Sequence, residues 1–363
     1  MQRPYRVLQV VTIMNRGGAE TMIMNHYRAI NRDEIQFDFL VHREAEGAYD
    51  KEIITLGGKI FKAFPIRPWN YVAYFKFLDK FFSTHHEYIA IHSHIQDNCG
   101  FAFKYAQKYG ITNCIANSHI APIKKDYKYL FRLIGKLYTN KYTTKRLACG
   151  TEAGKYMFGK RKFDLFNNAI DLDNFKFNST IRDIKRKELN LSDKFIIGNV
   201  ARFNTQKNHV FLIDIFNEVS KKCSNAHLLL VGNGDLKANI EKKVHDLGLE
   251  NKVSFLGVRS DVSQILQAMD VFLFPSLYEG LPVSVIEAQA TGIKCVLSDT
   301  IDKEVDVTNN VAFLSLDNTA EEWCDKILTF QHYNRIDTSN LVRDAGYDIK
   351  KNVKLLMSIY KNE

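Results

Sequence analysis

Short runs of β-branched and aliphatic residues alternate with longer amphipathic segments along this whole chain. The runs have the length of strands, and the segments between them carry apolar residues at helical spacing. Such alternation is typical of βαβ units, whose parallel strands are covered by helices on both faces. The expected strands are 6–13, 37–41, 88–92, 112–117, 145–149, 195–201, 227–231, 252–256, 271–274, 295–298 and 311–314, and the expected helices are 20–30, 71–82, 100–109, 127–141, 210–222, 236–247, 260–268, 282–291, 320–330 and 347–360.

So many strands would be unusual in one sheet, and 363 residues suffice for about two domains. We therefore predict two doubly wound, Rossmann-like α/β domains that face a cleft. In the polar stretch 173–192 the strand-like patterning stops, which places the boundary between a first domain, 1–175, and a second, 176–344. The helix in residues 345–363 is expected to pack back on the first domain.

Composition narrows the functional classes. Hydrophobic residues make up 45% of the chain and charged residues 25%, which excludes a disordered or fibrous protein. The net charge of +9 favours anionic partners and leaves nucleic acid, an acidic membrane face and sugar nucleotides open. The six cysteines are scattered and never form C-x-x-C, as in proteins with reduced thiols. With no signal-peptide pattern and no apolar run of ~20 residues, we expect a soluble intracellular protein.

In parallel α/β sheets, ligands bind where strands end and helices begin. Gly17 and Gly18 stand at such a point after the first strand, where two glycines let main-chain N–H groups approach a phosphate or a sugar. The segment lacks the G-x-G-x-x-G fingerprint, which weakens the case for a nicotinamide dehydrogenase. A simple tight turn is the alternative.

Arg202 and Lys207 follow the first strand of the second domain. Five residues apart across a loop, they could converge on one diphosphate, the guanidinium in bidentate fashion and the ammonium as a point charge. Two solvated surface charges are the alternative, made less attractive by the position at a strand end.

The segment 274–288 carries the densest signal. A buried strand stops at Pro275, Glu279 lies in the following loop, and Pro282 occupies the first helical position. The free N–H groups of that helix start offer an anion site, and Glu287 faces the same place from one turn further on. Two carboxylates there suit the hydroxyls of a sugar and a ribose. Capping together with a solvated carboxylate is the alternative.

Histidines end two strands of the first domain. His92 and His94 face one side and invite a metal site, which we disfavour because no carboxylate or cysteine stands at ligand spacing, so no metal is expected. We expect them to be core histidines, and His119 to contact a sugar hydroxyl or a developing charge. Asp171-Leu-Asp173 resembles a D-x-D metal motif, but its place at the end of the first domain predicts a turn.

Residues 124–162 are basic and aromatic together, and aromatic residues also crowd the helix expected at 71–82. Such helices suit the headgroup region of an anionic membrane. A solvated helix face is the alternative. Nucleic-acid binding would need the same composition, but no recognised RNA- or DNA-binding motif accompanies it.

Several of these motifs occur in a fixed order. They are Gly17-Gly18-Ala-Glu20, Ser118-His119, Asn168-Ala-Ile-Asp171, Arg202 with Lys207, Gly257-Val-Arg259-Ser-Asp261, and the Pro275–Ala288 segment with Glu279 and Glu287. In this order they resemble the group 4 retaining glycosyltransferases of the two-Rossmann-domain (GT-B) kind, close to bacterial exopolysaccharide and capsule transferases. The resemblance spans residues 7 to about 316, with two mild departures, Ala201 and Ala169, where that family usually has glycine.

The resemblance implies a role for each matching residue. The loop at Gly17-Gly18 would pack against the diphosphate and the acceptor side, and Arg202 with Lys207 would neutralise the leaving nucleoside diphosphate. His119 would contact the donor sugar near its reacting carbon. Glu279 and the main chain of Gly280, Leu281, Pro282 and Val283 would hold the sugar and phosphates, Glu287 the ribose, and Gly257 to Arg259 would flank the base.

The implied activity is retaining transfer of a sugar from a nucleotide donor, expected to be a UDP-sugar, to a lipid-linked glycan of a surface polysaccharide. No metal and no further cofactor is expected, since cations and helix N–H groups stabilise the leaving group. The protein would lie in the cytoplasm, peripheral on the inner face of the membrane. A non-catalytic sugar-nucleotide-binding protein or a basic nucleic-acid-binding protein is the alternative.

Overall fold

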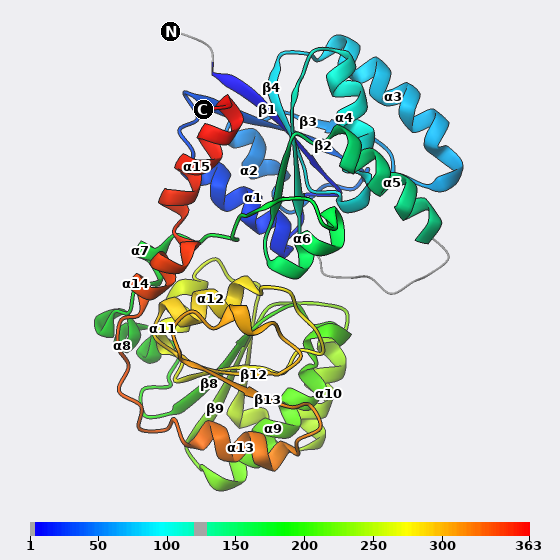
Figure 1. Ribbon diagram of the computed structural model, residues 1–363. Coiled ribbons are helices and arrows are strands. Elements are labelled where there is room, and N and C mark those ends of the chain that lie inside the picture. The colour runs from blue at the N-terminus through cyan, green and yellow to red at the C-terminus, as the bar shows by residue number, and fades with distance from the viewer. Residues whose placement is uncertain (1–3, 120–128) are drawn as a thin grey trace. The chain divides into compact units, whose positions relative to one another are not determined.

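The computed structural model describes residues 4–119 and 129–363, and its chain divides into two compact units (Figure 1). Unit 1 comprises the residues up to Ile170 together with Ile349–Glu363, and unit 2 is Asp171–Asp348. The contacts thus divide the chain after Ile170, where the sequence suggested residue 175, and again after Asp348, where it suggested residue 344.

Unit 1 is built on a parallel sheet of seven strands in the order β3-β2-β1-β4-β5-β6-β7. The order reverses beside β1, as in doubly wound folds, where ligands bind at the carboxyl ends of the strands. The strands are β1 (Tyr5–Val11), β2 (Ile35–Val41), β3 (Ile60–Lys62), β4 (Tyr88–Ser93), β5 (Asn113–Ser118), β6 (Lys145–Ala148) and β7 (Asp164–Leu165).

Helices cover both faces of this sheet, and each face has its own apolar core. The helices are α1 (Gly18–Ala29), α2 (Asp50–Thr55), α3 (Tyr71–Thr84), α4 (Cys99–Lys108), α5 (Tyr129–Tyr142), α6 (Thr151–Phe158) and α15 (Ile349–Lys361). The C-terminal helix α15 packs beside α1, and its residues Val353, Leu356 and Tyr360 are buried in the same core as strands β1 and β2. Two helices far apart in the sequence therefore share one face of the sheet.

Unit 2 contains a parallel six-stranded sheet in the order β10-β9-β8-β11-β12-β13. Its strands are β8 (Phe195–Val200), β9 (Ala226–Val231), β10 (Val253–Gly257), β11 (Val271–Phe274), β12 (Lys294–Ser298) and β13 (Val311–Leu314). Its helices are α7 (Leu172–Phe175), α8 (Ser179–Glu188), α9 (His209–Lys222), α10 (Lys237–Asp246), α11 (Val262–Ala268), α12 (Val283–Ala290), α13 (Ala320–Leu328) and α14 (Ser339–Val342). Both units are therefore Rossmann-like, as predicted.

All six cysteines are buried and free. Within residues 4–119 and 129–363, no helix combines the length and the apolar character that a membrane span requires.

Candidate active site

Two loops meet at the carboxyl ends of the adjacent strands β8 and β11 in unit 2. Lys207 in the first loop places its Nζ 2.5 Å from Oε1 of Glu279 in the second. The side chains of this pair are only 18% and 9% exposed, respectively. Nζ of Lys207 also lies 4.8 Å from the ring centroid of Phe274, the last residue of β11. The structure thus holds one ammonium and one carboxylate together over an aromatic ring.

Main-chain hydrogen bonds fix these loops to each other. The Leu277 N–H donates to the Gln206 carbonyl at 2.8 Å, and Nε2 of Gln206 donates to the Tyr278 carbonyl at 2.9 Å. The hydroxyls of Ser298, the last residue of β12, and of Thr300 both donate to the carbonyl of Ser276. Sequence reasoning missed these supporting residues, since a glutamine or serine in a loop carries no signal without its partner.

Local backbone chemistry explains how Lys207 reaches Glu279. The Asn204 side chain accepts from the Lys207 N–H and caps the short turn Thr205–Lys207. Asn208 then adopts a left-handed conformation, with φ of 52°, which asparagine tolerates better than most residues. Helix α9 starts directly afterwards, so the loop is held between a capped turn and a helix start.

Arg202 does not share the partner of Lys207. Its side chain is 64% exposed, and Nη2 lies 3.5 Å from a carboxylate oxygen of Asp235, in the loop after β9. That loop packs tightly against the Arg202 loop, because a Cβ on Gly232 would lie 2.0 Å from the Ala201 carbonyl oxygen and one on Gly234 2.3 Å from that of Phe203. Convergence of Arg202 and Lys207 on one diphosphate remains a prediction. The Asp235 carboxylate would compete with that diphosphate for Arg202.

The segment Gly280–Val283 leads from Glu279 into α12, whose N-cap is Pro282. Gly280 is exposed, Leu281 and Val283 are half-buried, and a Cβ on Gly280 would meet no atom within 4 Å. Glu287 lies on the first turns of α12, where desolvation raises the pKa of its carboxyl to about 8. A carboxyl in this environment holds a proton more tightly than a solvated one.

The Arg259 side chain forms an ion pair with Asp261, two residues further along the chain. It makes two hydrogen bonds to Asp261, at 2.8 and 2.7 Å, and Nζ of Lys185 lies 2.9 Å from the same carboxylate. These cations hold the pKa of Asp261 far below its usual range. Gly257, at the end of β10, has φ of +66° with open space where a Cβ would stand. The proposed place of Gly257 and Arg259 beside a base stays a prediction.

In unit 1, Gly17 is the N-cap of α1 and Gly18 its first residue. The Glu20 carboxylate folds back over Gly17, where an added Cβ would lie 2.3 Å from Oε2, while Gly18 has no atom within 4 Å of such a Cβ. Desolvation raises the pKa of Glu20. A carboxylate in front of this helix start was not foreseen, and it occupies the place where a phosphate was expected to approach.

His119 follows β5, and its imidazole joins a hydrogen-bonded group. Nε2 of His119 lies 2.9 Å from Nδ1 of His94, and Nε2 of His94 lies 3.0 Å from Oε1 of Gln9. Nδ1 of His119 is shielded from solvent. His92 and His94 are buried core residues, as expected, and they stand next to His119 rather than apart from it.

That the protein binds no metal stays a prediction for the described parts of the chain. No group of three or more histidine, cysteine or acidic side chains there has an arrangement that could hold an ion. Asp171, from the D-x-D motif, instead caps α7 by accepting from the Asp173 N–H, at the point where the chain passes from unit 1 to unit 2.

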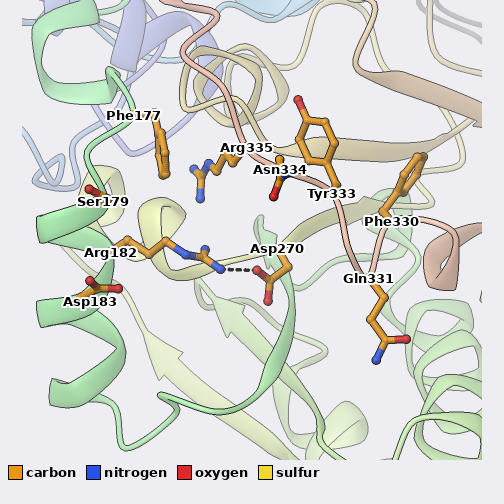
Figure 2. A pocket seen from close by; sticks show the side chains of 10 residues that line it. All are labelled: Phe177, Ser179, Arg182, Asp183, Asp270, Phe330, Gln331, Tyr333, Asn334 and Arg335. Carbon is orange, nitrogen blue, oxygen red and sulfur yellow. Dashed lines mark hydrogen bonds and ion pairs between the residues drawn. The ribbon is translucent and has the colours of Figure 1, made fainter.

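A cavity of about 260 Å³ lies elsewhere in unit 2 (Figure 2). Arg182 reaches across it to Asp270, which precedes β11, and the Arg335 guanidinium lies 4.6 Å from the Phe177 ring centroid. Both arginines donate to the Gln267 and Met269 carbonyls at the end of α11, at 2.7 to 3.1 Å. These cations stabilise a helix C-terminus at the amino ends of the strands, so the cavity is structural rather than the candidate site.

The basic and aromatic segment 124–162 is only partly described by the structure. Lys124, Lys125 and Lys128 fall outside the described residues. In α5 most of the exposed side chains are apolar, among them Leu130 and Leu137, each 70% exposed, while Lys141 is an exposed cation. Lys136 instead bonds the Tyr156 carbonyl. The exposed surface of α5 is therefore mainly hydrophobic, with basic residues among the apolar ones.

Known protein structures with a similar fold show the structural class to which this protein belongs. The Anabaena protein HepE, solved in complex with UDP, superposes with a TM-score of 0.80 at 19% identity, covering 99% of this chain and 100% of that one. A further HepE structure, in complex with UDP-glucose, gives 0.76 over the same share of each chain. The fold is therefore that of the GT-B glycosyltransferases.

Sequence comparison then gives the family. Residues 181–346 match the family model described as Glycosyl transferases group 1. EpsF of Bacillus subtilis (strain 168), named as a glycosyltransferase, is 34% identical over 368 residues, which are 98% of this chain and 96% of that protein. The Escherichia coli UDP-Gal:alpha-D-GlcNAc-diphosphoundecaprenol alpha-1,3-galactosyltransferase is 32% identical over 191 residues, 49% of this chain and 47% of that protein. The chain belongs to the group 1 glycosyl transferases.

Proposed function

We propose that this protein transfers a sugar from a UDP-sugar to a lipid-linked glycan, with retention of anomeric configuration, during synthesis of a surface polysaccharide. The observation that carries the proposal is the half-buried Lys207–Glu279 pair at the carboxyl ends of β8 and β11, directly before the start of α12. The E. coli relative, whose name gives UDP-Gal as donor and a diphosphoundecaprenol-linked acceptor, supports both substrate classes. HepE, which binds UDP and UDP-glucose, supports the donor.

The reaction proposed breaks the bond between the anomeric carbon and the diphosphate oxygen, and the electron pair leaves with UDP. An acceptor hydroxyl oxygen forms the new bond to the same face of that carbon, and its proton passes to the departing phosphate oxygen. Negative charge therefore grows on the diphosphate while the sugar gains oxocarbenium character. Fixed cations and helix N–H groups stabilise the diphosphate in the transition state more than in the ground state.

Each residue then has a role in this scheme. Lys207 holds the diphosphate, and Glu279, drawn close by the same ammonium, accepts from the hydroxyls of the donor sugar. Arg202 exchanges Asp235 for a phosphate, which its high exposure permits. The main-chain N–H groups of Gly280 to Val283 bind the phosphates and Glu287 binds the ribose, while Gly257 and Arg259 flank the base. In unit 1, His119 contacts the donor sugar and Gly17-Gly18 lines the acceptor side.

Metal independence is part of the proposal. Its support is the cation Lys207 at the carboxyl ends of β8 and β11, and we infer that no further cofactor is used. On the acceptor side, unit 1 would dock on the inner face of the cell membrane, where the lipid-linked glycan has its anchor. The apolar residues exposed on α5 support this docking.

The test measures hydrolysis and transfer of UDP-sugars by the purified protein, with and without a chelator. We expect turnover that the chelator leaves unchanged, and a loss on the order of 10² in kcat for Lys207→Met, as for removal of one fixed charge from a leaving group. Lys243→Met is the matched control, since Lys243 forms a comparable part-buried pair with Asp214 in the same unit.

Three results would count against the proposal. Activity abolished by the chelator and restored by manganese would overturn metal independence. Equal kcat values for the Lys207→Met and Lys243→Met variants would remove Lys207 from the site. UDP-sugar binding without turnover, or a salt-dependent RNA shift without turnover, would point to a binding protein instead.

A further inference from the structure

Five polar side chains form one continuous hydrogen-bonded group inside unit 1. It starts at His119, passes through His94 and Gln9, and reaches the hydroxyl of Tyr360, which receives Nε2 of Gln9 at 3.0 Å. The same hydroxyl lies 2.8 Å from Nδ1 of His92. Tyr360 belongs to α15, so the last helix of the chain contacts His92 in β4 directly. Through Gln9 it is connected to His94 and His119, which follow β4 and β5.

The Gln9 amide sets the direction of the bonds that lead to His119. Its Nε2 donates to Tyr360 and its Oε1 accepts from Nε2 of His94. Burial lowers the pKa of His94 well below its usual value and that of His119 to about 4, so both rings are neutral near pH 7 and carry one N–H each. With its N–H on Nε2, His94 accepts at Nδ1, and the proton shared with His119 therefore sits on Nε2 of His119.

The Tyr360 hydroxyl locks that direction. Its oxygen accepts from Gln9, and we assign its single proton to the hydrogen bond that it shares with Nδ1 of His92. Without this hydroxyl the Gln9 amide could turn over and present its NH₂ group to His94. His94 would then carry its proton on Nδ1, and His119 would have to switch its proton to the other nitrogen.

We infer that Tyr360 is a positioning residue for the transfer reaction, holding His119 through Gln9 and His94 in the tautomer with its proton on Nε2. The inference rests on the proposed function, in which His119 contacts the donor sugar. In this tautomer Nδ1 of His119 is an acceptor, suited to a hydroxyl of the donor sugar. The C-terminal helix thus takes part in preparing the site.

Burial supports a role beyond packing. Tyr360 is 1% exposed and Gln9 1%, while His92 is 2% exposed. Placing polar side chains in a core is unfavourable unless their hydrogen bonds are made, and the bonds that join these five side chains favour one arrangement. Apolar side chains of similar size would fill the same space without that requirement.

The experiment combines ¹⁵N NMR of the histidine rings with steady-state kinetics. The His119 signals are assigned from their loss in His119→Gln, and the ring nitrogen shifts report which nitrogen is protonated. The variants are Tyr360→Phe and Gln9→Met, which keep side-chain volume. Tyr27→Phe is the matched control, because Tyr27 is equally buried in the same core and its hydroxyl bonds Gln36 instead.

We expect wild-type His119 to be protonated on Nε2 and to shift toward Nδ1 in the Tyr360→Phe and Gln9→Met proteins. We expect kcat to fall about tenfold in both with donor KM within about twofold, a smaller loss than removal of a direct transition-state contact. The Tyr27→Phe protein should match wild type in both readouts.

Wild-type His119 protonated on Nδ1, or an unchanged tautomer and kcat in the Tyr360→Phe protein, would overturn the inference. A loss that appears equally in the Tyr27→Phe protein would show only a packing effect and would overturn it too. The NMR measurement needs no substrate. If the tautomer changes as expected but the protein turns over no donor, the proposed function would be contradicted, while the effect of Tyr360 on the His119 tautomer would stand.

Discussion

The half-buried carboxyl of Glu287 makes the stability of unit 2 depend on pH. Desolvation on α12 raises its pKa from the ordinary 4.5 to about 8. The folded state therefore binds this proton more tightly than the unfolded state, and the stabilisation is complete below pH 4.5 and disappears as the pH rises through about 8.

We predict that unit 2 becomes less stable between pH 6 and pH 8.5 in the wild type, and that Glu287→Gln removes part of this decline. The difference in Tm between the two proteins should change by about 2–4 °C across this range, which corresponds to ~1 kcal/mol for a unit of this size. Differential scanning calorimetry at both pH values measures it, with Glu241→Gln on exposed α10 as control. Parallel pH profiles for the wild type and the Glu287→Gln protein would contradict the prediction.

Among the helices and strands, α5 has the surface that differs most from the one expected from the sequence. Its inner face packs tightly on α4, since a Cβ on Gly100 would lie 2.1 Å from main-chain atoms of Tyr138 and Thr139. The outer face leaves Leu130 and Leu137 exposed, and Phe131 touches Tyr71 of α3, with ring centroids 6.4 Å apart. Near the start of α3, Trp69 and Val72 extend the same kind of surface.

We predict that the protein cosediments with anionic liposomes and that Leu130→Gln with Leu137→Gln weakens binding about 30-fold, which corresponds to ~1 kcal/mol for each partly inserted leucine. Because most of the exposed side chains of α5 are apolar, much of its contribution should persist at high salt, in contrast to a purely basic face. Leu355→Gln on α15, an exposed leucine of the same unit, is the control. Equal binding by all three proteins would show that α5 does not meet the membrane.

The elements themselves were largely predictable. The eleven strands expected from apolar runs all form, because buried parallel strands need continuous aliphatic sequence. The edge strands β3 and β7 were missed, since two or three partly exposed residues carry no such run. Helix α8 was missed as well, because its sequence Ser179–Glu188 is dominated by charges and its anchoring partner, Asp270, lies far along the chain.

The residues of the candidate site also divide into those that a local sequence pattern reveals and those that depend on distant contacts. Lys207 and Glu279 could be found because each follows a strand that the pattern reveals, and neighbouring parallel strands bring their ends together. The role of Asp235 beside Arg202, and of Gln9 and Tyr360 beside the histidines, could not be found. These pairs depend on contacts between segments whose sequences contain no mutual signal.

At the scale of the whole molecule, the two units differ in the number of chain segments that form them. Unit 2 is one continuous segment with its own core, whereas unit 1 needs α15, which follows unit 2 in the sequence. We predict that residues 171–348 alone fold and bind UDP, and that residues 1–170 alone do not fold stably. At about 100 times Kd, UDP should stabilise the fragment by ~2.7 kcal/mol and raise its Tm by about 5–10 °C.

Circular dichroism and thermal unfolding of the two fragments measure this, with the intact chain as reference. A folded, cooperative 1–170 fragment would contradict the role given to α15. An unfolded 171–348 fragment, or one whose Tm ignores UDP while that of the intact chain responds, would contradict the independence of unit 2.

The late position of α15 has a consequence for synthesis. When the ribosome has made residue 170, the sheet of unit 1 is present but the core that Tyr360 fills is still open. At ~5–20 residues per second, translation of unit 2 takes on the order of ten seconds or more before α15 appears. The half that is translated second can therefore finish folding first, and during that interval a nascent first half exposes apolar surface that chaperones recognise.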